Sequence, residues 1–505
     1  MSEFFHHSRL LRCRTPQGAA TTGQTVHIAA DTALPQGTEH ILRLWIEGEA
    51  ERLIPMRREN GRVLAEVPMP ERPCLVWYFF VLRLPDGHTL YYGARSGEGM
   101  FVKHEPEAYQ ITVYDPAFTT PRAFCEGVCY QIFPDRFKRS SWEDFRVRAG
   151  AHTARGRHIV LHDRWSEPPL DRPGPGQAHY TPNDYFGGDL NGIRQKLPYL
   201  ASLGVTWLYL NPIFEADSNH RYNTADYLAI DPILGSEDDL AALCREARAH
   251  GIRIMLDGVF SHTGADSRYF NREGRYGDLG AYQSKASPYY EWYSFAEHPD
   301  SYECWWGFPT LPNVKELTPS YVDFIAGENG VLAHWARCGA TSWRLDVADE
   351  LPDDFIRILR RRVKQLDPEG VLLGEVWEDC SNKFAGSVRR DYVDGDVLDS
   401  AMNYPFSEAV VRFLTGKADA YRLNDELATL REHYPKPFFD ASLNLMTSHD
   451  NVRTQTMLSG APDRMALPRE AQARYRPSER DARLGRRRMP LAAAIQAAFP
   501  GVPCI

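Results

Sequence analysis

The fold is decided by the stretch Arg344-Leu345-Asp346-Val347-Ala348-Asp349-Glu350, which follows Thr341-Ser342-Trp343. This pattern predicts a buried strand that ends in a loop carrying carboxylates. Side chains two residues apart on a strand point to the same face, so Arg344 and Asp346 should lie side by side. A guanidinium beside a carboxylate favours the ionised form and lowers its pKa. We therefore expect Asp346 to be an anion.

A second carboxyl group ends another apolar run. Residues 371–377 place Glu375 after the apolar sequence Val-Leu-Leu-Gly, and apolar surroundings raise the pKa of a carboxyl group. A retaining glycosidase uses one ionised and one protonated carboxyl about 5–5.5 Å apart. Asp346 and Glu375 therefore suit cleavage of a glycosidic bond, although each motif alone also fits a structural ion pair.

Size and charge limit the class of protein. A chain of 505 residues should form two or three domains, and 43% hydrophobic residues are enough for a large core. The net charge of −9 argues against nucleic-acid binding, and we interpret the basic run at residues 483–488 as the solvated start of a helix.

The N-terminus carries no long apolar segment of a secretory signal, and no run approaches membrane-spanning length. We therefore expect a cytoplasmic protein without a membrane partner. The nine cysteines are scattered, and Cys125 and Cys129 have no second pair to complete a zinc site, so we expect reduced and mostly buried thiols.

Residues 1–118 alternate short β-rich runs with turn signals such as Asn60-Gly61, which predicts an N-terminal β-sandwich. The runs are residues 26–28, 41–46, 75–82 and 109–114. Their aromatic side chains fit either a packed core or a surface that stacks on sugars.

From about residue 119 the pattern changes to apolar strands alternating with amphipathic helices. This alternation, with polar residues at strand ends, predicts an α/β fold of the (β/α)8-barrel type with its chemistry at the C-terminal face. We assign residues 119–262 to the first part of the barrel, with a polar loop reaching to about residue 180. Residues 263–320 form an inserted, irregular domain B that is rich in aromatic rings, and residues 321–505 form the second part.

Two further apolar stretches end in polar side chains. Residues 256–262 contain Asp257 and His262, and residues 445–451 contain His449 and Asp450. Together with the stretches around Asp346 and Glu375, they resemble the four signature regions of the α-amylase family of glycoside hydrolases, in the same order. Residues 211–214, 218–222, 226–232 and 311–314 are most similar to the neopullulanase, cyclomaltodextrinase and maltogenic amylase branch, as is the N-terminal sandwich.

The resemblance implies a role for three carboxyl groups. Asp346 would be the nucleophile that forms a covalent glycosyl-enzyme, and Glu375 the general acid and base. Asp450 would be the third carboxyl, which grips sugar hydroxyls and stabilises the distorted ring.

The resemblance also implies four substrate-binding residues. His262 and His449 would hydrogen-bond the sugar, Tyr222 would stack under it, and Arg344 would orient Asp346. A histidine at a strand end is otherwise usually a packing residue.

No cofactor is expected, because glycosidic hydrolysis needs none. Calcium is disfavoured, because Ser261 stands where many family members have Asn and residues 135–142 replace the Asn/Asp-rich calcium loop, although Gly187-Gly188-Asp189 remains. We therefore predict no metal site.

Family members continue through strand eight, helix eight and a C-terminal β-domain. Here the eighth strand begins near Gly501 and the sequence stops at Ile505, so we expect a barrel truncated at strand eight, with an exposed edge.

The leading hypothesis is a retaining α-glucan hydrolase that cleaves α-1,4 bonds in cyclodextrins, pullulan or maltooligosaccharides. An α-glucosidase or oligo-1,6-glucosidase stays open as an alternative, and so does a non-catalytic glucan-binding protein. The expected partner is an α-glucan oligosaccharide, and the resemblance allows a homodimer formed through the N-terminal domain.

Overall fold

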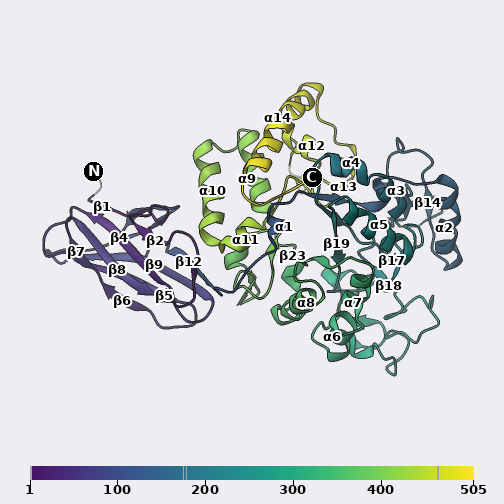
Figure 1. Cartoon of the computed structure of the whole chain (residues 1–505), viewed down its shortest axis with the longest axis horizontal. Helices are drawn as coiled ribbons and strands as arrows, with labels where there is room; N and C mark the ends of the chain where they lie inside the picture. The colour runs from purple at the N-terminus through teal and green to yellow at the C-terminus, as the bar shows by residue number, and fades with distance from the viewer. Residues whose placement is uncertain (1–2, 175, 178, 463–465) are drawn as a thin grey trace. The chain divides into compact units, whose positions relative to one another are not determined.

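The computed structural model of the chain describes residues 3–174, 176–177, 179–462 and 466–505. These residues group into two compact units, which we describe separately (Figure 1). The first unit holds Met1–Thr120 and Trp377–Ser442, and the second holds Pro121–Val376 and Leu443–Ile505. The grouping of residues 377–442 with the N-terminal segment was not predicted.

The N-terminal part of the first unit consists of two sheets, as predicted. One sheet has the order β1-β4-β8-β7, with β2 paired to β4, and the other has β11-β10-β9-β12-β3, with β5 paired to β9 and β6 to β5. The strands are β1 (Phe4–Phe5), β2 (Arg14–Thr15), β3 (Ala20–Thr21), β4 (Thr25–Thr32), β5 (Glu39–Ile46), β6 (Arg52–Pro55), β7 (Arg57–Glu59), β8 (Arg62–Pro68), β9 (Cys74–Arg83), β10 (Thr89–Arg95), β11 (Glu98–Val102) and β12 (Tyr109–Tyr114).

The aromatic residues of these strands lie either in the core or at the surface. Tyr78, Phe80 and Tyr109 are buried in the core between the sheets, which explains them by packing. Trp45 and Trp77 instead stack on each other with ring centroids 4.5 Å apart, and Trp45 is 38% exposed. The rest of this unit contains β26 (Ser400–Ala401) and the helices α9 (Tyr404–Leu414), α10 (Ala420–His433) and α11 (Lys436–Asp440).

The second unit contains a parallel sheet of the barrel type. Its strands pair in the order β23-β22-β19-β16-β13-β28-β27. They are β13 (Cys129–Ile132), β16 (Trp207–Leu210), β19 (Arg253–Gly258), β22 (Ser342–Leu345), β23 (Leu372–Gly374), β27 (Leu443–Leu445) and β28 (Val502–Cys504). All residues of β16 and β22 are buried, as parallel strands covered on both faces require.

The eighth strand forms where the sequence analysis expected it to begin. Cys504 of β28 pairs with Cys129 of β13, and Val502 pairs with Leu443 of β27. Because β28 is bonded along both sides, the sheet has no exposed edge at this position, and the expectation of an exposed edge at strand eight was wrong.

Helices follow most of these strands. They are α3 (Leu190–Gln195), α4 (Leu197–Ser202), α5 (Glu237–Ala249), α6 (Pro319–Ala326), α7 (Val331–Arg337), α8 (Asp353–Leu366), α12 (Thr454–Leu458) and α14 (Glu479–Ala498). The predicted capping box opens α5, because the Ser236 side chain accepts the N–H of Asp239. Residues 263–318, all of which the structure describes, contain no α-helix, in agreement with an irregular insertion.

The expectation about the segment before residue 180 was also wrong. The segment expected to loop out before residue 180 contains α2 (Trp142–Ala154), a helix of 13 residues. Ser141 caps it by accepting the N–H of Asp144 at 3.2 Å, and Phe145 and His152 are buried.

Two simpler expectations concern cysteines and membranes. All nine cysteines are free, and most are buried as predicted, while their reduced state stays a prediction. Within the described ranges, no helix has both the length and the apolar character needed to cross a bilayer.

Candidate active site

The polar strand ends of the second unit gather at one edge of the parallel sheet. In the pairing of β19 with β22, Asp257 lies opposite Arg344, and in the pairing of β22 with β23, Leu345 lies opposite Gly374. Asp346 and Glu375 each follow directly after these strands. The carboxyl ends of parallel strands meet at the same edge, which is where barrel enzymes carry their chemistry.

One guanidinium binds three carboxyl groups at this edge. Nη1 of Arg344 lies 2.8 Å from Oδ1 of Asp257 and 2.9 Å from Oδ1 of Asp346, and Nη2 lies 2.7 Å from Oε2 of Glu375. The Arg344 side chain is fully buried. Asp346 and Glu375 are therefore close enough to share a single cation.

The backbone after Asp346 contributes a further contact. Val347 adopts a left-handed conformation with φ of 39°, and its N–H donates to Oε2 of Glu375 at 2.9 Å. A β-branched residue avoids positive φ unless its surroundings enforce it. This turn thus directs a backbone donor from the Asp346 loop to the second carboxyl group.

The pKa of Asp346 differs from the sequence-based expectation. Burial raises it well above the usual range, the Arg344 guanidinium lowers it, and the neighbouring Glu375 and Asp257 raise it again. Burial also raises the pKa of Asp257, against the lowering effect of Arg344 and Tyr209. The expectation that Arg344 lowers the pKa of Asp346 was wrong, because burial and the two neighbouring carboxyl groups raise this pKa by more than one guanidinium lowers it.

Tyr222 joins this cluster to the histidines. Its hydroxyl donates to Oδ2 of Asp257 at 2.8 Å and accepts from the Asn211 amide at 2.9 Å. Its ring stacks on the His449 ring with centroids 5.3 Å apart and an angle of 7°. Nε2 of His262 lies 3.0 Å from the Tyr222 carbonyl oxygen, to which it donates.

His449 is neutral and has a defined tautomer. Burial lowers its pKa to about 3, with a further contribution from Arg344. Its Nδ1 accepts from the side-chain amides of Gln131 and Asn211, each at 3.1 Å, so the proton lies on Nε2. Nε2 lies 3.4 Å from Oδ2 of Asp450, whose side chain is 37% exposed.

The structure therefore brings together all seven predicted site residues. Arg344 connects Asp346 with Glu375, Asp257 connects Arg344 with Tyr222, and Tyr222 contacts both histidines, of which His449 reaches Asp450. Three residues of this network had no predicted role: Asp257, Asn211 and Gln131. Asp257 was visible as a polar strand end, whereas nothing in the sequence distinguishes Gln131 from an ordinary polar residue on a strand.

The segment that replaces the expected calcium loop is held by guanidinium groups. Arg139 donates to the carbonyl oxygens of His162, Phe186 and Asp163 at 3.2, 3.1 and 3.0 Å. Arg148 lies 2.5 Å from Asp189. Among the residues that the structure describes, no group of three or more His, Cys, Asp or Glu side chains is arranged to hold a metal ion. That the protein works without a metal or cofactor stays a prediction.

Comparisons with known proteins agree with the barrel and show that the chain is a glycoside hydrolase. Residues 131–473 match the alpha amylase catalytic domain. The chain belongs to the α-amylase family. Relatives include an amylopullulanase of Thermoanaerobacterium saccharolyticum, 35% identical over 97% of this chain and 40% of the relative, and neopullulanase 2 of Thermoactinomyces vulgaris, 34% identical over 76% and 60%.

A solved cyclomaltodextrinase matches 100% of this chain and 77% of its own, with a TM-score of 0.60 and 27% identity. These matches confirm the predicted family, with relatives of the neopullulanase and cyclomaltodextrinase branch. The chain spans less than half the length of the amylopullulanase.

Proposed function

We propose that the chain is a retaining hydrolase of α-1,4-glucosidic bonds in cyclodextrins, pullulan or maltooligosaccharides. The observation that carries this proposal is the binding of Asp346 and Glu375 by one buried guanidinium. Retention requires two carboxyl groups close together, one ionised and one protonated. In this proposal Asp346 acts as the ionised group and Glu375 as the protonated one.

In the first step, Asp346 attacks the anomeric carbon as a carboxylate, and the bond to the leaving oxygen breaks. Glu375 donates its proton to that oxygen, so that no free alkoxide forms. Arg344 holds both carboxyl groups in place and offsets the charge that moves between them.

In the second step, water replaces the leaving sugar. Glu375, now a carboxylate, takes a proton from this water, whose oxygen attacks the anomeric carbon and releases Asp346. The product keeps its original anomeric configuration, and both side chains return to their starting forms.

The remaining site residues bind the sugar in this proposal. Tyr222 offers an aromatic face that is fixed by its bond to Asp257. His449 presents a protonated Nε2 beside Asp450, a donor and acceptor pair suited to adjacent sugar hydroxyls. His262 supports the Tyr222 backbone.

The substrate class is supported by the relatives' names, which refer to pullulan and cyclomaltodextrin. Release of reducing sugar from β-cyclodextrin, pullulan and maltotriose tests it, with Glu375→Gln and Asp346→Asn as inactive controls. Hydrolysis of maltotriose or isomaltose alone would favour the α-glucosidase or oligo-1,6-glucosidase alternative. Equal background from the wild-type chain and both variants would leave only a glucan-binding protein.

Two further proposals are that the protein forms a homodimer and that it lies in the cytoplasm. Light scattering of the purified chain, compared with a chain lacking residues 1–118, tests a homodimer formed through the sandwich. Fractionation of expressing cells tests the cytoplasmic location.

A further inference from the structure

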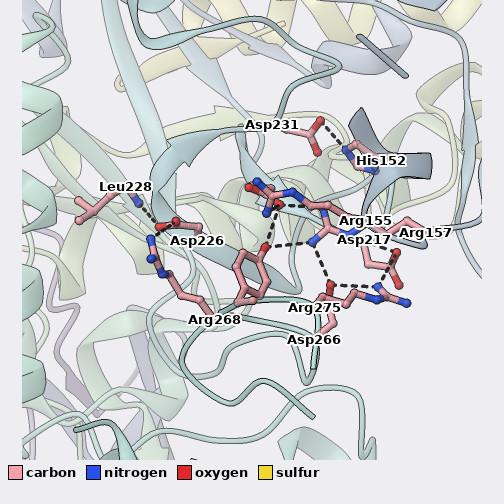
Figure 2. A network of polar contacts seen from close by, with 12 residues as sticks. His152, Arg155, Arg157, Asp217, Asp226, Leu228, Asp231, Asp266, Arg268 and Arg275 are labelled. Carbon is pink, nitrogen blue, oxygen red and sulfur yellow. Dashed lines mark hydrogen bonds and ion pairs between the residues drawn. The ribbon is translucent and has the colours of Figure 1, made fainter. Parts of the chain in front are cut away.

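A buried cluster of charges lies in the second unit, apart from the proposed catalytic carboxyls. Arg157 is at its centre, with a fully buried side chain (Figure 2). Its Nη1 lies 2.9 Å from Oε1 of Glu215, its Nη2 2.9 Å from Oδ2 of Asp266, and its Nε 3.6 Å from Oδ1 of Asp217. Three carboxylates thus surround one guanidinium.

Two more arginines complete the charge balance. Arg155 lies 2.6 Å from Oε1 of Glu215, and Arg275 lies 3.4 Å from Asp217 and 3.3 Å from Asp266. The Tyr276 hydroxyl also donates to Glu215 at 2.8 Å. Three cations and three anions therefore cancel within the cluster.

The cluster joins three segments that are distant in the sequence. Arg155 and Arg157 follow α2, the helix that the sequence analysis missed. Glu215 belongs to β17 (Phe214–Ala216), which pairs with β18 (Thr224–Ile230). Asp266 and Arg275 belong to the irregular segment that begins after His262. Arg157 contacts the other two segments directly.

The turn between β17 and β18 carries Tyr222 of the candidate site. Asp217 fixes one end of this turn through Arg157 and Arg275. A second ion cluster fixes its middle, because Arg221 lies 3.0 Å from Asp231, and Asp231 lies 3.0 Å from His152 of α2. The α2 segment therefore holds this turn at two places.

Stability alone does not account for the three charges of this cluster that are buried, those of Arg157, Glu215 and Asp266. A buried ion pair costs desolvation energy and can often be replaced by apolar side chains without loss of stability. Opposed charges do specify one arrangement of the segments that carry them, because any shift leaves a buried charge unpaired. Such a device suits a turn whose Tyr222 must meet Asp257 at hydrogen-bond distance.

We propose that Arg157 is a positioning residue, which fixes the turn at residues 218–223 so that Tyr222 presents its ring to the sugar. The claim that Tyr222 is presented to the sugar rests on the proposed function, whereas the claim that Arg157 fixes the turn is independent of it. Arg157 touches neither substrate nor the reacting carboxyls, and it acts through β17.

Kinetics test the effect on substrate. Arg157→Met should lower kcat/KM about 10–100-fold, mainly through KM, as displaced supporting contacts do. Arg155→Met is the matched control, because Arg155 contacts the same Glu215 but its side chain is 38% exposed, and it should change kcat/KM by less than about 3-fold. Arg157→Lys should recover part of the loss.

A double-mutant cycle shows whether Arg157 acts through Tyr222. In a Tyr222→Ala background, Arg157→Met should have little further effect on kcat/KM, because the ring to be positioned is gone. Arg157→Met should still lower the Tm when Tyr222→Ala is present. Multiplicative losses in kcat/KM from the two substitutions would overturn the proposal.

Hydrogen exchange of the ligand-free protein tests the turn without any substrate. Peptides that cover residues 218–223 should exchange faster in Arg157→Met than in the wild type, while peptides from β16 stay unchanged. Equal exchange in residues 218–223 would overturn the proposal. If Arg157→Met does not fold, Asp266→Asn, which removes one partner charge, takes its place. A wild-type chain without activity on any glucan would refute the proposed function and leave this measurement valid.

Discussion

Nη2 of Arg344 lies 2.7 Å from Oε2 of Glu375, while Nη1 of the same side chain binds Asp346. The guanidinium comes from β22, and the two carboxyl groups follow β22 and β23. The two acids proposed for catalysis are thus linked through a buried cation that is held on β22, the strand that precedes Asp346. This link makes the ionisation of one acid depend on the other.

Removal of this cation should impair activity and move its pH profile. Arg344→Met takes away the group that lowers the pKa of Asp346, so burial and the neighbouring carboxyls raise that pKa further. The nucleophile then ionises only at higher pH, and the acidic limb of kcat/KM against pH should shift upward. We also expect kcat to fall at least about 100-fold at the optimum.

Arg253→Met is the control for this substitution. Arg253 begins β19, at the opposite end of the sheet from the site, and pairs with Asp367 at 3.2 Å. Its loss should reduce stability without moving the acidic limb. An unchanged limb in Arg344→Met would contradict the shared-cation mechanism.

Tyr222 should contribute through both its ring and its hydroxyl. Tyr222→Phe keeps the ring beside His449 but removes a donor from Asp257, and we expect a loss in kcat/KM of about 3–10-fold. Tyr222→Ala also removes the ring, and we expect KM to rise by about a further 10-fold. Steady-state kinetics on β-cyclodextrin measure both. Equal losses from the two variants would assign the whole effect to the hydroxyl.

His449 should make the stability of the protein depend on pH. Its folded pKa is about 3, below the value of 6.5 in the unfolded chain, because burial disfavours the charged ring. As pH falls below 6.5, His449 binds a proton in the unfolded state but not in the folded state. The free energy of unfolding therefore declines between pH 6.5 and about 3, and His449 does not affect it above pH 6.5. The slope from one such histidine is at most about 1.4 kcal/mol per pH unit.

Urea unfolding at several pH values measures this slope. In His449→Asn it should fall by the contribution of one proton, whereas His88→Asn, at a histidine whose side chain is 79% exposed, should leave it unchanged. A slope that does not differ between the wild type and His449→Asn would show that the ring is already charged in the folded protein.

The strand ends could be predicted from the sequence, and the charges at the site could not. Apolar runs before Asp257, Arg344 and Glu375 mark parallel strands, whose carboxyl ends meet at one edge in a barrel. The pKa of Asp346, in contrast, depends on burial and on Asp257 and Glu375, which belong to other strands. The stretch of sequence around Asp346 shows only Arg344, two residues before it, and not these two carboxyl groups.

The helix α2 was missed for a different reason. Only Phe145, Ala149 and His152 of its 13 residues are buried, so it has no apolar stripe of the kind that predicts an amphipathic helix. Long-range polar contacts anchor it instead, such as the contact between His152 and Asp231, which are 79 residues apart. Contacts of this kind leave no periodic signal in the sequence.

The loop after β13 should be stable without calcium. Arg139 donates to the carbonyl oxygens of His162, Phe186 and Asp163, and carbonyl oxygens are groups that calcium also binds. The guanidinium therefore supplies the positive charge that these oxygens need, and Arg148 does the same for Asp189. Treatment with EDTA should change neither Tm nor the rate of glucan hydrolysis.

Arg139→Met should destabilise the protein by about 2 kcal/mol, because it removes charge-assisted hydrogen bonds to three carbonyl groups, of which those to His162 and Phe186 are partly buried. Scanning calorimetry measures the resulting fall in Tm. Arg172→Met is a matched control in the same polar segment, since Arg172 is 71% exposed and forms an ion pair with its neighbour Asp171. If Arg139 already satisfies these carbonyl oxygens, calcium has no site to bind in this loop. A fall in Tm after EDTA that added calcium reverses would therefore contradict the prediction.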